Sequence, residues 1–197
     1  MKSAIATFTD TSGADMPAAP FVRAACLSVA IWATLSAPVH ADPDFDELVG
    51  KARAVDGDTL EFGFKRVDLW GADALERFQK CLVNGQTTAC GADAWQVITN
   101  LIAAGPITCK VQGKNRYHRN MAICRNANGQ DIGQGLIARG MAVARTDEMP
   151  SYGSVENSAR QSRAGAWAGQ FIDPLLWRRG ERLPEHQTEV RRWQRDE

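Results

Sequence analysis

The chain has 197 residues, of which 44% are hydrophobic and 23% charged, so it can bury one good-sized core. Lys and Arg together number 23, and so do Asp and Glu, which gives a formal net charge of zero. This composition excludes a disordered chain, a collagen and a coiled coil. It also argues against binding nucleic acid through a strongly basic surface, so any such role must belong to a local site.

Residues 1–41 have the pattern of a secretory signal peptide. Arg23 precedes an apolar run over residues 24–35, and the small-residue cleavage site Val39-His40-Ala41 follows. The run is shorter than the roughly 20 residues that span a bilayer, so we expect export to the periplasm or the extracellular space with no membrane anchor. A buried N-terminal helix is the alternative. Met16 is a candidate for the true start, because the polar residues before it are unusual in front of a signal.

The four cysteines that follow the signal are an even number, which suits disulfides in an oxidising compartment. They allow three pairings, and the sequence alone does not choose among them. Local geometry favours Cys81–Cys90 across a polar loop and Cys109–Cys124 between neighbouring strands. Four free thiols are the alternative, and a zinc site is disfavoured because no CxxC motif occurs.

The first half of the remaining chain reads as short antiparallel strands and then a helix. Strands are expected at residues 48–55, 59–63 and 66–71. Apolar residues spaced by three and four then predict a helix over residues 94–102, which Gly105-Pro106 ends.

The second half returns to strands and closes with two helices. We expect strands at residues 107–111 and 121–125, an extended piece at 141–145, and helices at 132–139 and 154–164. The whole pattern predicts an α+β, mainly β fold: a five-stranded barrel of the oligonucleotide-binding type with about three packed helices. We expect this domain to span residues 42–178 and a charged tail to occupy residues 179–197.

Three carboxylates fall where such a barrel could bring them to one rim. Asp58 follows a turn signal, and Asp73 and Glu76 come just after a strand. Carboxylates with a backbone carbonyl and waters can supply the oxygen ligands of a hard cation such as calcium. Spacing alone is weak support, because Asp56-Gly57 is also an ordinary hairpin turn.

Several segments keep the order and spacing of one known family over nearly the whole of residues 42–178. These segments are Val55–Leu60, Val67–Glu76, Arg116–Arg119 with Met121-Ala122, Leu136–Gly140, Tyr152–Glu156, Ala159-Arg160, Gly165–Trp167 and Phe171–Arg178. On these residues the chain resembles the thermonuclease family, whose members are similar to micrococcal nuclease.

The resemblance implies a role for each matching residue. Those at Asp58 and Asp73 bind calcium in the family, together with the backbone carbonyl at Ala74. The residue at Glu76 activates or orients the attacking water, and that at Arg119 contacts the phosphate. The implied reaction is metal-assisted hydrolysis of phosphodiester bonds in DNA or RNA.

The chain departs from the family pattern next to these residues. A phosphate-binding arginine is replaced by Asp68, the proline before Glu76 by Leu75, and a common aspartate by Asn115. Arg66 lies on the same face of the strand as Asp68 and is a possible partial substitute. Alternatively, Asp68 could join the other carboxylates as a fourth.

Two hypotheses follow. The first is an exported calcium-dependent nuclease acting on nucleic acid, with activity weakened by Asp68. The second is a non-catalytic module of the same fold that binds calcium, another ligand or an unknown protein partner. Asp68 and the neutral charge favour the second, and the retained Asp58, Asp73, Glu76 and Arg119 favour the first. We expect a monomer and expect calcium binding to be better preserved than hydrolysis.

Overall fold

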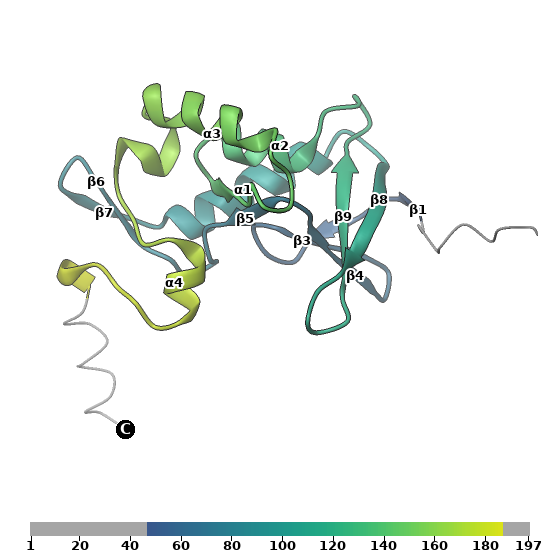
Figure 1. Ribbon diagram of the computed structural model, residues 1–197, viewed down its shortest axis with the longest axis horizontal. Coiled ribbons are helices and arrows are strands. Elements are labelled where there is room, and N and C mark those ends of the chain that lie inside the picture. Colours follow the sequence, from purple (N-terminus) through teal and green to yellow (C-terminus); the bar gives the residue numbers. More distant parts are fainter. Residues whose placement is uncertain (1–46, 187–197) are drawn as a thin grey trace, which may run out of the picture. The chain divides into compact units, whose positions relative to one another are not determined.

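The computed structural model describes residues 47–186 (Figure 1). The expected signal peptide over residues 1–41, its alternative start at Met16, and tail residues 187–197 lie outside the described residues. Within residues 47–186, no helix combines the length and the apolar character that a membrane crossing requires.

The main sheet has the strand order β1-β8-β9-β4-β3-β2. Its neighbours pair antiparallel except β4 and β9, which are parallel. The strands are β1 (Glu47–Gly50), β2 (Arg53–Ala54), β3 (Thr59–Phe62), β4 (Lys65–Leu69), β8 (Ile107–Lys114) and β9 (Asn120–Arg125).

The sheet curls because its two edge strands are consecutive in the chain. β1 pairs with β8 at one edge and β2 with β3 at the other, yet only residues 51–52 separate them. The strand expected over residues 48–55 is therefore broken into two pieces that serve opposite edges. This curled half-barrel with three main helices confirms the expected oligonucleotide-binding type of fold (Figure 1).

Two smaller sheets flank the main one. β5 (Ala72–Ala74) pairs with β10 (Ala142–Ala144), and β6 (Cys81–Val83) pairs with β7 (Gln86–Thr88) and β11 (Gly169–Gln170). The prediction of a polar loop between Cys81 and Cys90 was wrong, because this stretch forms the β6–β7 hairpin. Asn84 and Gly85 have φ values of 52° and 76°, the positive values that a two-residue hairpin turn requires.

The three expected helices are present, and a fourth follows. The expected helices are α1 (Cys90–Ile102), α2 (Ile132–Ala138) and α3 (Tyr152–Gln161), and the fourth is α4 (Pro174–Arg178), which follows the short 3-10 helix Gly165–Ala168. α1 begins before the expected residue 94. α4 was not predicted, although the Asp173 carboxylate accepts a hydrogen bond from the Leu175 N–H and Pro174 opens the helix.

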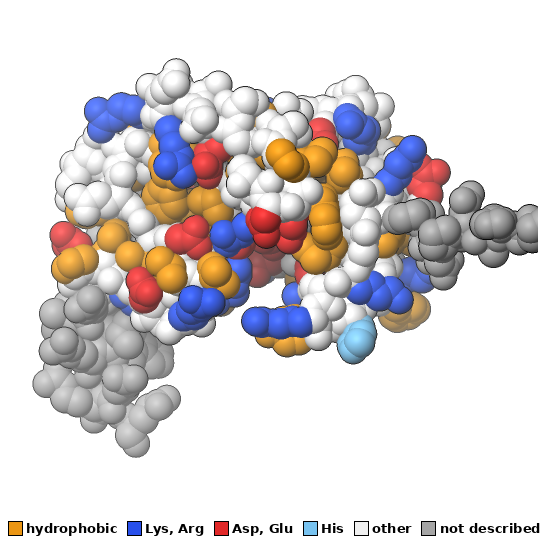
Figure 2. All heavy atoms as spheres, viewed as in Figure 1, with side chains coloured by type: hydrophobic (Ala, Val, Ile, Leu, Met, Phe, Trp, Pro, Cys, Tyr) orange, Lys and Arg blue, Asp and Glu red, His pale blue; other side chains and the backbone are white. Residues whose placement is uncertain are grey.

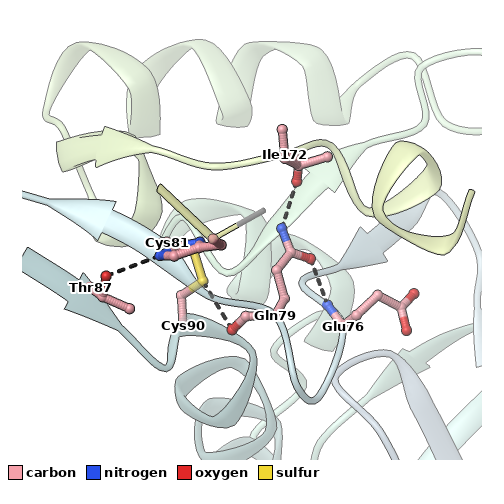
Figure 3. Close-up of a disulfide and its surroundings, with 7 residues drawn as sticks. Glu76, Gln79, Cys81, Thr87, Cys90 and Ile172 are labelled. Atoms are coloured by element: carbon pink, nitrogen blue, oxygen red, sulfur yellow. Dashed lines mark hydrogen bonds between the residues drawn. A yellow bond between two sulfur atoms is a disulfide. The ribbon is translucent and has the colours of Figure 1, made fainter. Parts of the chain in front are cut away.

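The main core lies between the curled sheet and α1 and α2. Its fully buried residues come from the sheet and from the two helices, and include Leu60, Val67, Ile98, Leu136 and Ile137. Both expected disulfides are formed. Cys109 and Cys124 face each other on β8 and β9 inside this core, and Cys81–Cys90 joins the β6–β7 hairpin to the start of α1 (Figure 3).

Candidate functional site

β5 and the loop after it bring the three expected carboxylates together. Asp73 lies on β5 and is 7% exposed, and Glu76 follows in the loop. Asp58 stands just before β3, and its Oδ2 accepts a hydrogen bond of 3.1 Å from the backbone N–H of Ala74. This bond fixes Asp58 beside Asp73.

The backbone that carries Glu76 is held by Gln79, a side chain that is 1% exposed. Its Oε1 accepts the Glu76 N–H at 3.0 Å, and its Nε2 donates to the Ile172 carbonyl at 2.6 Å (Figure 3). Leu75, which stands where the family has proline, donates its N–H to the Met141 carbonyl at 3.0 Å. Proline could not make this bond. The position of Glu76 is therefore set by Gln79 and by Met141, the residue before β10, rather than by a proline ring.

Asp73 is enclosed by two arginines. Arg178, the last residue of α4, donates from Nη1 to Oδ1 at 2.9 Å and from Nη2 to Oδ2 at 2.8 Å. Arg178 Nη1 also lies 2.5 Å from Glu76 Oε1. Arg145, which follows β10, pairs through Nη2 with Asp73 Oδ2 and lies 3.5 Å from Asp173 Oδ1.

These contacts give the carboxyl groups different acidities. Burial raises the pKa of Asp73, but the hydrogen bonds and charges of Arg178 and Arg145 outweigh it and the net pKa is lowered. For Glu76 burial outweighs Arg178, and its pKa is raised. Burial and the nearby Asp73 charge raise the pKa of Asp58 to about 7.

The Asp68 carboxylate is bound by three side chains, those of Thr59, Asn115 and Arg119. Its Oδ1 accepts from the Thr59 hydroxyl at 3.0 Å, and its Oδ2 accepts from Asn115 Nδ2 at 2.7 Å. Arg119 Nη2 completes an ion pair with Oδ2 at 3.0 Å. The guanidinium that the resemblance assigns to the phosphate is thus engaged by a carboxylate of the same chain.

Arg66, considered above as a substitute for the missing arginine, is directed to another residue. Its Nε donates to Glu61 at 3.1 Å, and Glu61 also pairs with Arg53 at 2.6 Å. Asp68 forms the ion pair with Arg119, and the Thr59 hydroxyl that it shares with Asp58 places it next to that carboxylate.

The donor set around Asp73 does not fit a resident calcium ion. Calcium takes six to eight oxygen ligands, whereas both Asp73 oxygens already accept guanidinium N–H groups. The expected carbonyl ligand belongs to Ala74, whose N–H donates to Asp58. Among residues 47–186, no group of three or more His, Cys, Asp or Glu side chains is arranged to hold a metal.

No sequence pattern predicted Arg145, Arg178 or Gln79 as site residues. The two arginines lie in stretches that were interpreted only as an extended piece and as part of a family motif. Their pairing with Asp73 depends on how α4 and the segment after β10 fold back on β5. Figure 2 shows acidic and basic side chains interspersed on the face that it views, without one continuous patch of either sign.

Two comparisons with known proteins identify the family of the chain. The sequence model of the family described as "Staphylococcal nuclease homologue" (SNase) matches residues 66–169. A relative, "Succinoglycan biosynthesis protein ExoI" of Rhizobium meliloti (strain 1021), is 35% identical over 128 residues, which cover 64% of this chain and 67% of the relative. The chain therefore belongs to the staphylococcal nuclease homologue family.

Proposed function

We propose that this chain is an exported, non-hydrolytic member of its family that serves as a binding module for a ligand or protein partner. The observation that carries this proposal is the ion pair between Asp68 and Arg119, 3.0 Å apart, at the position where the family binds phosphate. The neutral net charge of the chain supports a partner other than nucleic acid.

A phosphodiester at this place would meet the wrong charge. A phosphate and the Asp68 carboxylate about 4 Å apart repel by on the order of 4 kcal/mol at an effective dielectric constant near 20. Arg119 would also have to leave Asp68 before it could contact the phosphate. Arginines that stabilise a transferring phosphoryl group contribute roughly 10³ to 10⁵ in rate in other enzymes, so engaging one of them and replacing another removes most of the expected catalysis.

Export is supported by the signal-like residues 1–41 and by the two disulfides, which suggest an oxidising environment outside the cytoplasm. The name of the relative refers to succinoglycan biosynthesis and not to nucleic-acid hydrolysis.

A calcium-dependent nuclease is the second candidate, because Asp58, Asp73 and Glu76 stand together in the family order. Under this alternative calcium would have to displace the guanidinium groups from Asp73 before reaction. The two candidates make opposite predictions for the same assay.

The deciding experiment measures cleavage of single-stranded DNA and RNA by the full chain, with calcium and with a chelator. We expect the wild type to cleave no faster than the buffer control, and Asp68→Arg to gain little while Asp73 stays paired with arginine. Asp147→Arg, which makes the same charge change at an exposed residue, is the matched control. Cleavage by the wild type that Glu76→Gln abolishes would overturn the proposal.

A further inference from the structure

We infer that Arg145 and Arg178 take the place of a divalent cation beside Asp73, and that this contact latches α4 onto β5. The role of these arginines does not depend on whether the chain hydrolyses phosphodiesters. It assigns them a structural function, the neutralisation of the buried carboxylate of Asp73.

Arg178 contacts two carboxylates, those of Asp73 and Glu76, at the same time. Its two terminal nitrogens meet the two oxygens of Asp73 at 2.9 and 2.8 Å, the forked arrangement that matches a guanidinium to a carboxylate. The same Nη1 lies 2.5 Å from Glu76 Oε1. One guanidinium therefore holds both carboxylates.

Arg145 supplies the second positive charge. Its backbone N–H donates to the Gly71 carbonyl at 2.9 Å, which places the side chain next to β5 and its Nη2 against Asp73 Oδ2. Two guanidinium groups carry the same total charge as one calcium ion. The buried carboxylate of Asp73 is therefore neutralised by the chain itself.

Guanidinium groups and a cation compete for the same oxygen lone pairs. Calcium must approach carboxylate oxygens to about 2.3–2.6 Å, and both Asp73 oxygens accept N–H groups. A cation that displaced these bonds would also leave two positive charges close to its own. Arg178 keeps 41% of its side chain exposed, so solvent and ions can reach the site once that side chain is shortened.

The same contacts fasten both ends of α4. Arg178 at the end of the helix binds Asp73 directly, and Asp173 at its N-cap lies 3.5 Å from Arg145, which also binds Asp73. A helix of five residues has little stability of its own, so its position depends on such tertiary contacts. Asp73 is thus the point on β5 to which α4 is tied.

Calcium titration of the full chain tests the cation part of this inference. Calorimetry should detect no saturable binding to the wild type, and its Tm should be the same in calcium and in a chelator. The double variant Arg145→Gln/Arg178→Gln should bind calcium with a Kd on the order of 1 mM, as weak extracellular calcium modules do, and its Tm should rise with calcium. Adding Asp73→Asn to that variant should abolish the binding.

Arg179→Gln is the matched control, because Arg179 is the exposed neighbour of Arg178. It should behave as the wild type does. Saturable calcium binding by the wild type that requires Asp73 overturns the inference, and so does a folded double variant that binds calcium no better than the wild type. Because these readouts are heat and Tm, they are independent of the cleavage assay.

Hydrogen exchange tests the latch, even if the double variant does not fold. Arg178→Lys keeps the charge but cannot make the forked contact. The α4 amides should then exchange at least about tenfold faster, which is a loss of roughly 1.4 kcal/mol of local protection, while those of α1 keep their rates. Unchanged exchange in α4, relative to Arg179→Lys, would overturn the latch.

Discussion

At the scale of single residues, the pKa of Asp58 differs from that of its neighbour Asp73 because their surroundings differ. The Oδ2 of Asp58 accepts one backbone N–H from Ala74, which favours the charged carboxylate, but burial and the neighbouring Asp73 charge disfavour it more strongly. The pKa of Asp58 is therefore about 7, far above the ordinary value of 3.8. Asp73, on β5, has a lowered pKa because two arginines face it.

The raised pKa of Asp58 predicts a loss of stability as pH rises. A carboxyl group whose folded pKa exceeds its unfolded pKa binds its proton more tightly in the folded state, so its stabilising effect is present at low pH. That effect is lost between about pH 4 and pH 7. Asp58→Asn removes this dependence. Urea unfolding at pH 5 and pH 8 should show the wild type losing free energy of unfolding relative to Asp58→Asn across this range.

Asp147→Asn, a change of the same type at an exposed residue, controls for the general effect of removing a negative charge. It should keep the pH slope of the wild type. If Asp58→Asn also kept that slope, Asp58 would not be the group that responds.

At the scale of elements, the first turn of α1 lies against the loop that carries Glu76. The Gly91 N–H donates to the Gln79 carbonyl at 3.1 Å. A Cβ on Gly91 would come within 1.7 Å of the Glu76 carbonyl oxygen, closer than any real contact allows. Glycine at this point of the helix allows the loop and α1 to pack closely, and this packing positions the backbone of Glu76.

Gly91→Ala should therefore destabilise the fold by about 2–3 kcal/mol, at the upper end of overpacking effects. The shift should appear in urea unfolding and in the chemical shifts of the Glu76 loop. Gly113→Ala is the matched control, because the nearest atom to its Cβ would be a Trp70 ring carbon at 4.0 Å. Equal effects of the two substitutions would show that Gly91 has no special role.

At the scale of the whole molecule, each disulfide belongs to one of the two cores. Cys109–Cys124 joins facing residues of β8 and β9 in the core of the curled sheet, with a sequence separation of 15. Cys81–Cys90 lies in the smaller core with Leu75 and Ala94 and spans 9 residues. The two bonds therefore stabilise different parts of the same folded unit.

Removing Cys109–Cys124 by double alanine substitution should lower the free energy of unfolding by about 3 kcal/mol from loop entropy, with a further loss from the cavity. The same treatment of Cys81–Cys90 should cost slightly less, about 2.6 kcal/mol, because its loop is shorter. Urea unfolding of the oxidised wild type and both variants measures this order. A Cys109–Cys124 variant as stable as the wild type would contradict it.

The sequence was sufficient for the general fold and for the acidic residues, because both depend on local pattern. Alternating strands, the helix period and the family motif placed Asp58, Asp73 and Glu76 at one site and identified Asp68 as a departure. The β6–β7 hairpin was missed although Asn84-Gly85 carries the sequence signal of its turn. The start of α4 was likewise marked by Asp173 and Pro174.

The ion pairs of the site could not be predicted in the same way. Arg178 is 105 residues from Asp73 and Arg145 is 72 residues from it, so their contact depends on the packing of α4 and of the β10 segment. Arg119 meets Asp68 only because β4 and β9 run in parallel side by side. Such pairings are properties of the tertiary structure.

The contacts of α4 also bear on where this domain ends as a folding unit. The family match stops at residue 169, yet the chain beyond it supplies the Ile172 carbonyl to Gln79 and the Arg178 guanidinium to Asp73. His186, which is 4% exposed, meets the Thr87 hydroxyl on β7 at 3.0 Å. A protein shortened at the family boundary would leave the buried Gln79 Nε2 without its acceptor and would leave Asp73 with Arg145 but without Arg178. The autonomous unit for expression or for domain fusion therefore extends at least to residue 186.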